Sequence, residues 1–591
     1  MPDPPFLTFK AVNRSPRVPP KTGKPIPDYL SPSRSDQAKR LLPKFGKLEE
    51  ALAHKSFQLH VDAPGYLAEE ILVLEIAGGL EDFLETLREV EGFEWLGDEQ
   101  VDFTPDEDGF RKRDPRKQSE SVGGLLYLFA TNLPALQQLK SAWKQKADGE
   151  GLSGITSKLG KMARIYDGHA PSAWARMIDW LQWKYQVLFI ISAGNCSRIP
   201  VEMSLSELEK LSPEELEKAF VAFRIAEARQ LRLLSPAESI NAITVGSHHS
   251  DETGPVNLSS IQLMPIRHPD MPSPSSRNGP GFLRSVKPDI LMPGGRQPIS
   301  VIGDKANCYL GHLAPGQKVA APPSPGQPGP ATKFIRGTSG ATALATRQAA
   351  ILIEQLSEMA TPPPPSHMAV IVKTLLTHGA SWNDADTHLR SMFGSPGSKH
   401  IKWKGGTVSP LVGHGRINEK LLNSIEGHRA TVLGWDTISE DESLEFRFPI
   451  PASLGTAKGK KRFTVTLAYL SPINPHNRKY RTARLSFKFP ELINAFLSKK
   501  GRRNVDDKQG CKGTIQHEIY EDETLRGIVD GEFIINVECR EEGGLMDTPV
   551  PFALAVTLEG APEIFPNIRP EITEHLRNIT AVPLSSGRVP V

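Results

Sequence analysis

From about residue 172, hydrophobic positions alternate between the period of a helix and the character of a buried strand. One helix is indicated by apolar residues on a single face: Trp174, Met177, Ile178 and Leu181. The run Val187–Ile191 follows, apolar on both faces, as in a central strand of a parallel sheet covered by helices. Ser212–Glu215 opens another helix with a capping box, and Ala242–Gly246 is the next strand. This alternation predicts an α/β fold.

After residue 430 the apolar positions change to a period of two. Four segments show it: 444–450, 463–469, 533–537 and 552–558. Phe463, Val465, Leu467 and Tyr469, for example, alternate with threonines and an alanine. Several such strands separated by turn-rich segments are typical of a β-sandwich.

The remaining stretches suggest how the chain is divided. Residues 1–45 are rich in Pro, Lys, Arg and Ser and are predicted to be a disordered arm. The run Ile71–Ile76, a helical pattern after it and then Phe93–Leu96 predict a small N-terminal α/β module over 46–150. The larger α/β domain is expected at 155–425, the β-sandwich at 430–565 and a tail at 566–591. Residues 314–330 are interpreted as a Pro/Gly-rich loop.

Composition narrows the class of protein. The chain has 591 residues, and its 70 Lys and Arg nearly balance its 68 Asp and Glu, so we expect no nucleic-acid partner. Its 4 cysteines form no CxxC pair or Cys/His cluster, so we expect no metal, no disulfide framework and no cofactor. No apolar run approaches the roughly 18 residues of a membrane span, and the N-terminus lacks a secretory pattern. These features predict a cytoplasmic protein with no membrane partner.

Ser339 is the first candidate for chemistry. It lies in Gly337–Ala345, where a polar loop meets a helix of small residues. A serine at a helix start has free backbone N–H groups and the positive end of the helix dipole close by, which favour negative charge on an attacked carbonyl. Taken alone, Ser339 is more simply interpreted as the cap of a buried helix, because serine is a preferred cap.

Asn195 is the second candidate. It follows the apolar run Val187–Ile191, and ligands of open α/β sheets bind beyond the carboxyl ends of the strands. Its side-chain amide could donate a hydrogen bond to an oxyanion, although asparagine is also a common turn residue.

Four segments, taken in order, resemble the subtilisin-like serine proteases: Phe189–Asn195, Ala242–Ser247, Lys287–Gly295 and Gly337–Ser339. The resemblance covers roughly residues 165–385 and implies a parallel sheet flanked by helices at 155–425. It implies that Ser339 is the nucleophile and that Asn195 is the oxyanion donor. The substrate would be a peptide or protein. The N-terminal arm and the segment 471–475 further resemble a branch of large bacterial subtilases, which implies an AAA-type ATPase as a possible partner.

The family's histidine and aspartate motifs, which should precede Asn195, are missing. The nearest candidates for the base and its orienting acid are His169 and Asp167, and these are more simply interpreted as a surface loop. Between the β–α–β unit of the N-terminal module, which ends near 106, and the matching segment, which begins near 165, there is too little chain for two further strands and a helix. We therefore interpret the peptidase domain as truncated by an internal deletion, which leaves sheet edges unpaired.

Two functions are compatible with these motifs. The chain is either a serine endopeptidase whose base is an unrecognised histidine, or a catalytically dead pseudo-protease that binds peptides or partners. His378 is expected to be structural, because it follows Ser339 in the chain and has apolar neighbours. His248 and His249 are expected in a solvated loop.

Overall fold

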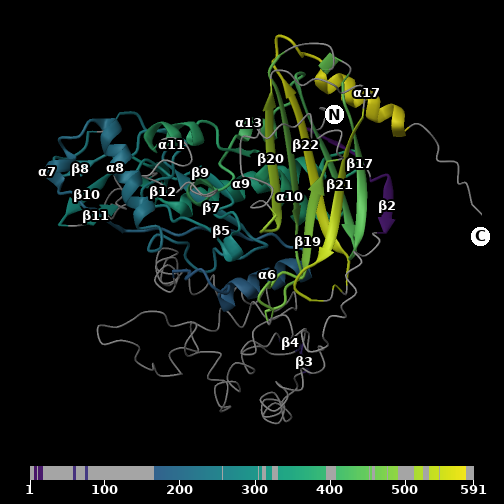
Figure 1. Cartoon of the computed structure of the whole chain (residues 1–591), viewed down its shortest axis with the longest axis horizontal. Coiled ribbons are helices and arrows are strands. Elements are labelled where there is room, and N and C mark those ends of the chain that lie inside the picture. The colour runs from purple at the N-terminus through teal and green to yellow at the C-terminus, as the bar shows by residue number, and fades with distance from the viewer. Residues whose placement is uncertain are drawn as a thin grey trace, which may run out of the picture.

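The computed structural model describes residues 5–9, 11–16, 58–61 and 74–77 and most of 165–580. The longer gaps in that last range are 309–314, 322–330, 394–407, 490–510 and 523–531. Figure 1 shows two large parts side by side, an α/β part in blue and teal and a β-rich part in green and yellow. The fold is therefore mixed α/β with a C-terminal β-sandwich.

The central sheet of the α/β part has the order β14-β15-β9-β7-β5. Its strands are β5 (Ile190–Ser192), β7 (Ile243–His248), β9 (Ile290–Pro293), β14 (Ala380–Ser381) and β15 (Arg416–Ile417). β5, β7, β9 and β15 run parallel, and β14 is antiparallel to β15. Parallel neighbours need long crossover connections, and residues 193–242 and 249–289 form the ones that join β5 to β7 and β7 to β9.

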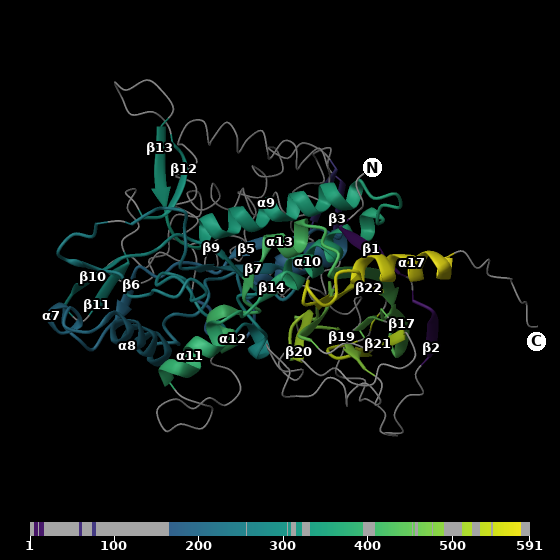
Figure 2. The same cartoon turned by 90° about the horizontal axis from the view of Figure 1, so that it is seen from above.

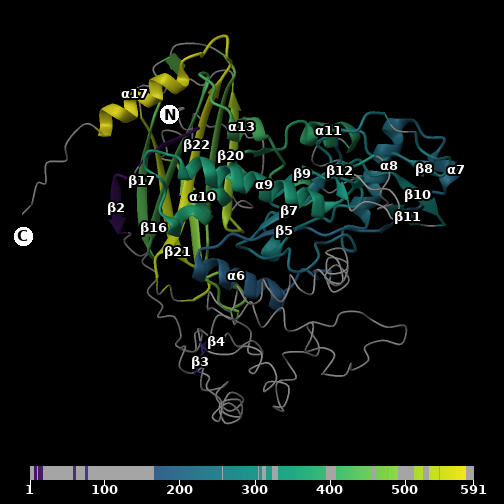
Figure 3. The same cartoon turned by 180° about the vertical axis from the view of Figure 1, so that it is seen from behind.

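Helix α9 (Thr338–Ser357) packs on β5, β7 and β9. Small side chains on its inner face, Ala341, Ala345 and Ala349, are buried in the same core as Ile243 and Val245. Helix α10 (Pro365–His378) lies between α9 and the sandwich strands β18 and β22 (Figure 3). It therefore joins the two parts into one hydrophobic core.

The strand formed by the run Val187–Ile191 differs from the prediction. Only residues 190–192 form β5, which pairs with β7 alone among the described residues. Its side chains are half-buried and not fully enclosed. A sequence typical of a central strand thus lies at the edge of the sheet that the described residues form.

A smaller unit extends from the end of the central sheet. Its sheet has the order β6-β11-β10-β8, formed by β6 (Arg198–Pro200), β8 (Gln262–Leu263), β10 (Ile299–Ile302) and β11 (Lys305–Cys308). The helices around it are α7 (Leu205–Leu208), α8 (Pro213–Ala226), α11 (Ala385–Phe393) and α12 (Val408–Val412). In α8, Ser212 and Glu215 form the predicted capping box.

Part of the stretch interpreted as a Pro/Gly-rich loop is regular structure. β12 (Gln317–Ala321) and β13 (Ala331–Ile335) form an antiparallel hairpin that stands out from the molecule in Figure 2. The sequence of β12 shows little alternation of apolar and polar residues, because this hairpin has little buried surface on either face. β13 leads directly to α9.

The sandwich consists of two sheets, β1-β16-β22-β18-β20 and β19-β21-β17-β2. The long strands are β16 (Arg429–Ile438), β17 (Glu442–Pro449), β18 (Lys461–Tyr469), β19 (Ala483–Lys488), β20 (Ile515–Asp522), β21 (Glu532–Glu541) and β22 (Val550–Gly560). The inward residues Phe446, Phe448, Phe463 and Phe552 share one aromatic core. The period-two pattern therefore marks the strands correctly.

The N-terminal arm predicted to be disordered is ordered in part, and the tail contains a helix. Residues 6–16 of the expected disordered arm form β1 (Phe6–Thr8), parallel to β16, and β2 (Asn13–Pro16), antiparallel to β17. The tail contains α17 (Ile568–Thr580), whose Ile568 and Ile572 are buried in the sandwich core. In the N-terminal module, β3 (Gln58–Val61) pairs antiparallel with β4 (Leu74–Ala77), and the rest of the module lies outside the described residues.

Among the described helices, none combines the length and the apolar character that crossing a bilayer requires.

Lys373 of α10 places a buried amine at the junction of the two parts. It is fully buried, and its Nζ donates to the Tyr469 carbonyl at 3.0 Å and to Thr514 Oγ1 at 2.6 Å. Burial lowers the pKa of this amine from 10.5 to about 7. Between these two values the unfolded chain holds a proton that the folded chain has lost, so folding becomes more favourable as the pH rises.

Replacing Lys373 with methionine should remove this dependence. The midpoint of thermal unfolding should rise less between pH 7 and pH 10 in Lys373→Met than in the parent, because the titrating group is gone. The exposed Lys218→Met on α8 is the control and should keep the parent's slope. An unchanged pH slope in Lys373→Met would show that the amine is not the buried titrating group.

Candidate active site

Ser339 lies in the first turn of α9 and is exposed, while its neighbours Thr338 and Gly340 are buried. The residue before the helix, Gly337, has φ +108°, a conformation that glycine adopts without strain. Gly337 is also the N-cap residue of α9, and because it has no side chain it cannot cap the helix with a hydrogen bond. The first backbone N–H groups of α9 therefore lie next to the Ser339 hydroxyl with few partners.

Asn195 is placed by the loop that follows β5. Gly194, with φ +93°, turns the chain after the strand, and the Arg277 guanidinium donates to the Asn195 carbonyl at 3.0 Å. The Asn195 side chain reaches the start of α9. Its Oδ1 accepts from the Thr338 backbone N–H at 2.9 Å and from Thr338 Oγ1 at 3.3 Å.

These two hydrogen bonds fix which end of the amide is available. Because Oδ1 is held by Thr338, the Nδ2 group is left as a donor beside the residue that precedes Ser339. A hydroxyl nucleophile and a fixed amide donor at one helix start can act on a single carbonyl, one attacking its carbon and the other binding its oxygen. The structure thus brings Ser339 and Asn195 into one neighbourhood.

Gly337 leaves room for this amide. A Cβ at Gly337 would lie 2.6 Å from Asn195 Oδ1 and 3.1 Å from Nδ2. Gly337→Ala should therefore push Asn195 away from the start of α9 and also strain the backbone by about 1–3 kcal/mol. We expect a lower thermal midpoint and slower reaction of Ser339 with a fluorophosphonate.

Gly303→Ala is a matched control for this prediction. Gly303 also has positive φ, +61°, but a Cβ there would contact nothing within 4 Å. This variant should carry the backbone strain without slowing the reaction of Ser339. Equal reaction rates in both variants would contradict the role given to the Asn195 amide.

Comparison with known proteins assigns this part of the chain. Residues 159–396, which include Asn195 and Ser339, match the sequence model of the subtilase family. This segment belongs to the subtilase family. The match ends before the sandwich, so the family is assigned to the α/β part.

Two individual similarities were found for this chain. It is 26% identical over 359 residues to the uncharacterised protein y4bN of Sinorhizobium fredii, covering 59% of this chain and 74% of that protein. It is 16% identical to the prenylagaramide maturation protease PagA, whose solved structure aligns with a TM-score of 0.23. That alignment covers 44% of this chain and 60% of PagA.

Asp167 and His169, the weak candidates for acid and base, lie together in an exposed loop of the subtilase segment. The Asp167 carboxylate accepts from the His169 backbone N–H at 2.8 Å, and the Tyr166 hydroxyl donates to the His169 carbonyl at 2.7 Å. The carboxylate thus binds backbone and does not orient the imidazole.

The surroundings of His169 are also separate from the serine. His169 lines a cavity of about 840 Å³ together with Arg176, Arg232 and Arg284. Ser339 and Asn195 do not line that cavity, and among the described residues no contact joins His169 to Ser339.

The other histidines singled out in the subtilase segment are buried. His378 hydrogen-bonds to Thr466 Oγ1 at 2.7 Å and Thr557 Oγ1 at 2.6 Å, which ties α10 to the sandwich. His248 and His249 are not solvated as predicted, because the end of β7 and the loop after it are covered. Burial lowers the pKa of each to about 3. Within the described part of the chain, no histidine hydrogen-bonds to Ser339.

Thr338 is the site residue that the sequence did not single out. It stands in the Gly-Thr-Ser stretch, but its two bonds to Asn195 join residues that are far apart in the chain. Only the folded arrangement of β5 and α9 shows that it holds the Asn195 amide.

Proposed function

We propose that this chain is a subtilisin-like serine endopeptidase that hydrolyses peptide bonds through Ser339. The Ser339 Oγ attacks the peptide carbonyl carbon, and Asn195 Nδ2 binds the oxygen that becomes negative. One observation carries the proposal: Thr338 holds the Asn195 amide oxygen, which leaves the donor end beside the start of α9.

The reaction needs a proton acceptor. The hydroxyl proton must pass to a base as the bond to the carbonyl carbon forms, and the base must return it to the leaving amine. We assign this role to a histidine that the sequence motifs do not reveal and that lies outside the contacts described for Ser339. Substrate binding is assigned to the α/β part, where Ser339 is exposed to an incoming peptide.

A second function, a pseudo-protease that binds peptides without cleaving them, is favoured by a different observation. Among the described residues Ser339 has no histidine partner, and no described strand pairs with β5 on the side away from β7. Both features fit the internal deletion inferred from the spacing of the chain. Such a protein would keep the oxyanion donor but lack an activated nucleophile.

Reaction with a fluorophosphonate distinguishes the two functions, because only an activated serine is phosphonylated at a useful rate. The native chain should be labelled at a single site, which peptide mapping should place on Ser339. Heat-denatured chain is the control and should not be labelled. An unlabelled native chain would refute the endopeptidase and support the pseudo-protease.

A further inference from the structure

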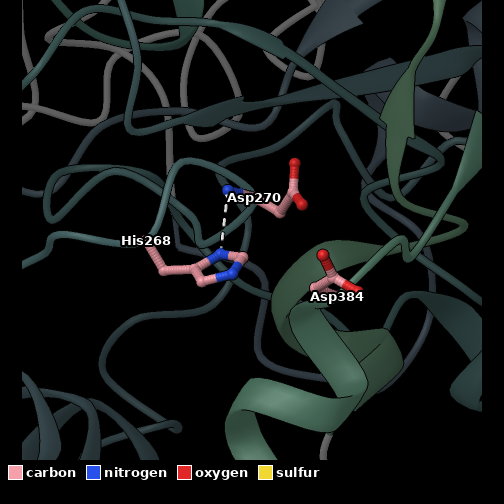
Figure 4. A group of neighbouring side chains, drawn as sticks. All are labelled: His268, Asp270 and Asp384. Carbon is pink, nitrogen blue, oxygen red and sulfur yellow. Dashed lines mark hydrogen bonds between the residues drawn. The ribbon is translucent and has the colours of Figure 1, made fainter.

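Three side chains with metal-binding atoms lie together in the smaller unit, and none of them belongs to the active site described above. They are His268, Asp270 and Asp384, and their ligand atoms all lie within 4.8 Å of one another (Figure 4). His268 and Asp270 belong to the segment between β8 and β9, whereas Asp384 directly precedes α11. Distant parts of the chain thus bring one imidazole and two carboxylates to one point.

The segment with His268 and Asp270 is held in place by α8. Glu217, which is buried, accepts the backbone N–H of Arg267 at 3.3 Å and that of His268 at 3.2 Å. The Asp270 N–H in turn donates to His268 Nδ1 at 3.3 Å. This long, weak bond, dashed in Figure 4, uses the Nδ1 lone pair, so an ion would bind at Nε2 or take the place of the Asp270 N–H at Nδ1.

Asp384 does not behave as an ordinary helix cap. Its carbonyl accepts the His388 N–H at 2.8 Å, so it stands at the start of α11. An aspartate in that position usually accepts backbone N–H groups with its carboxylate. Here, within the described residues, no hydrogen bond reaches that carboxylate, which lies across from His268 in Figure 4. Asn383 before it has φ +47°, a left-handed turn conformation that asparagine tolerates.

A further set of side chains surrounds this group. The His388 ring stacks on that of His268 with 4.3 Å between centroids, and His388 Nε2 lies 3.4 Å from Glu217 Oε1. Arg416 lies 3.3 Å from Asp270 Oδ1, so its ion pair engages one of the two carboxylate oxygens. Partners of this kind orient metal ligands and keep carboxylates in place.

We propose that His268, Asp270 and Asp384 bind a divalent transition-metal ion, zinc foremost, with water completing the coordination. One imidazole nitrogen and two carboxylate oxygens form a mixed donor set that suits zinc, whereas calcium and magnesium take oxygen ligands. In a tetrahedral site, zinc bonds of about 2.0–2.2 Å place neighbouring ligand atoms roughly 3.3–3.6 Å apart. The ligand atoms here lie within 4.8 Å of one another, and a change of rotamer of the exposed Asp384 can bring them to the separation in a zinc site. The ion would fasten the segment before β9 to α11.

The competing interpretation is an ion pair without metal, in which a protonated His268 lies between two carboxylates. Titration of the chelator-treated, full-length chain with zinc by calorimetry separates the two. We expect one zinc site in the parent. In Asp384→Asn the zinc affinity should fall by at least about 10–100-fold, the loss that is typical when a residue behind the ligands is replaced. His268→Ala should have the same effect.

Asp386→Asn is the matched control, because Asp386 lies on the same helix and pairs with Arg390 at 2.8 Å. It should bind zinc as the parent does. Asp384 is exposed, so Asp384→Asn should fold, and its unchanged circular dichroism without metal should confirm this. Failure of the parent to bind zinc, unaltered binding by Asp384→Asn, or equal binding of calcium would each overturn the proposal. None of these outcomes depends on peptidase activity.

Discussion

Replacing Ser339 with alanine should abolish the hydrolysis of an unfolded protein substrate by this chain. Alanine leaves the start of α9 intact, because the Ser339 side chain is exposed and α9 is not capped by it. Without the hydroxyl no covalent intermediate can form. The expected loss is about 10⁶-fold in kcat, the size of the effect when the nucleophile of subtilisin is removed. The measurement is the initial rate of peptide release at saturating substrate.

Ser357→Ala serves as the control for this change. Ser357 ends the same helix, and its hydroxyl donates to the Ile353 carbonyl at 2.7 Å, far from the first turn. It should retain the parent's rate. A rate that survives in Ser339→Ala would show that the hydrolysis belongs to another serine or to a contaminating protease.

Replacing Asn195 with aspartate should separate the two ends of its side chain. The new carboxylate can still accept from the Thr338 N–H and Oγ1, so the loop after β5 should stay in place. The donor end, however, becomes an oxygen that repels the developing oxyanion. Loss of one such donor costs about 10²–10³-fold in kcat in subtilisin, and the added repulsion should bring Asn195→Asp to at least that size. KM should change little, because the donor acts mainly in the transition state.

Asn418→Asp is the control for the chemical change itself. Asn418 caps α13 (Glu419–Asn423) by accepting the Lys420 N–H, a task that aspartate performs equally well. This variant should keep both kcat and KM. An Asn195→Asp chain with the parent's kcat would contradict the oxyanion role.

The sequence predicts those elements whose pattern is local. The helical face around Trp174 and Leu181 becomes α6 (Ala173–Tyr185), and Ser212 and Glu215 cap α8 as their spacing indicates. The alternating phenylalanines of the sandwich become its core. In each case the residues that make the pattern also make the contacts.

The errors fall where order depends on distant partners. Phe6 has no periodic neighbours, yet β1 is ordered because it pairs with β16, more than four hundred residues later. His248 and His249 are next to each other and polar, so they suggest a loop, but the segment around Pro272 covers them.

In the candidate site, too, some residues could be predicted from the sequence, whereas contacts between distant segments could not. Ser339 and Asn195 stand in short stretches that the family resemblance marks, so both could be named from the sequence. The hydrogen bonds of Thr338 to Asn195 and the grouping of His268 with Asp384 join separate segments, and no spacing rule reveals them. The general base is the part that neither the motifs nor the described contacts supply.

Ser339 and Asn195 are expected to act on one carbonyl group, and a crystal structure of the phosphonylated chain tests this most directly. The phosphonyl oxygen occupies the place of the oxyanion in such an adduct. It should lie about 2.7–3.1 Å from Asn195 Nδ2 and be attached through phosphorus to Ser339 Oγ. An adduct on Ser339 whose oxygens all point away from the Asn195 amide would contradict this joint action.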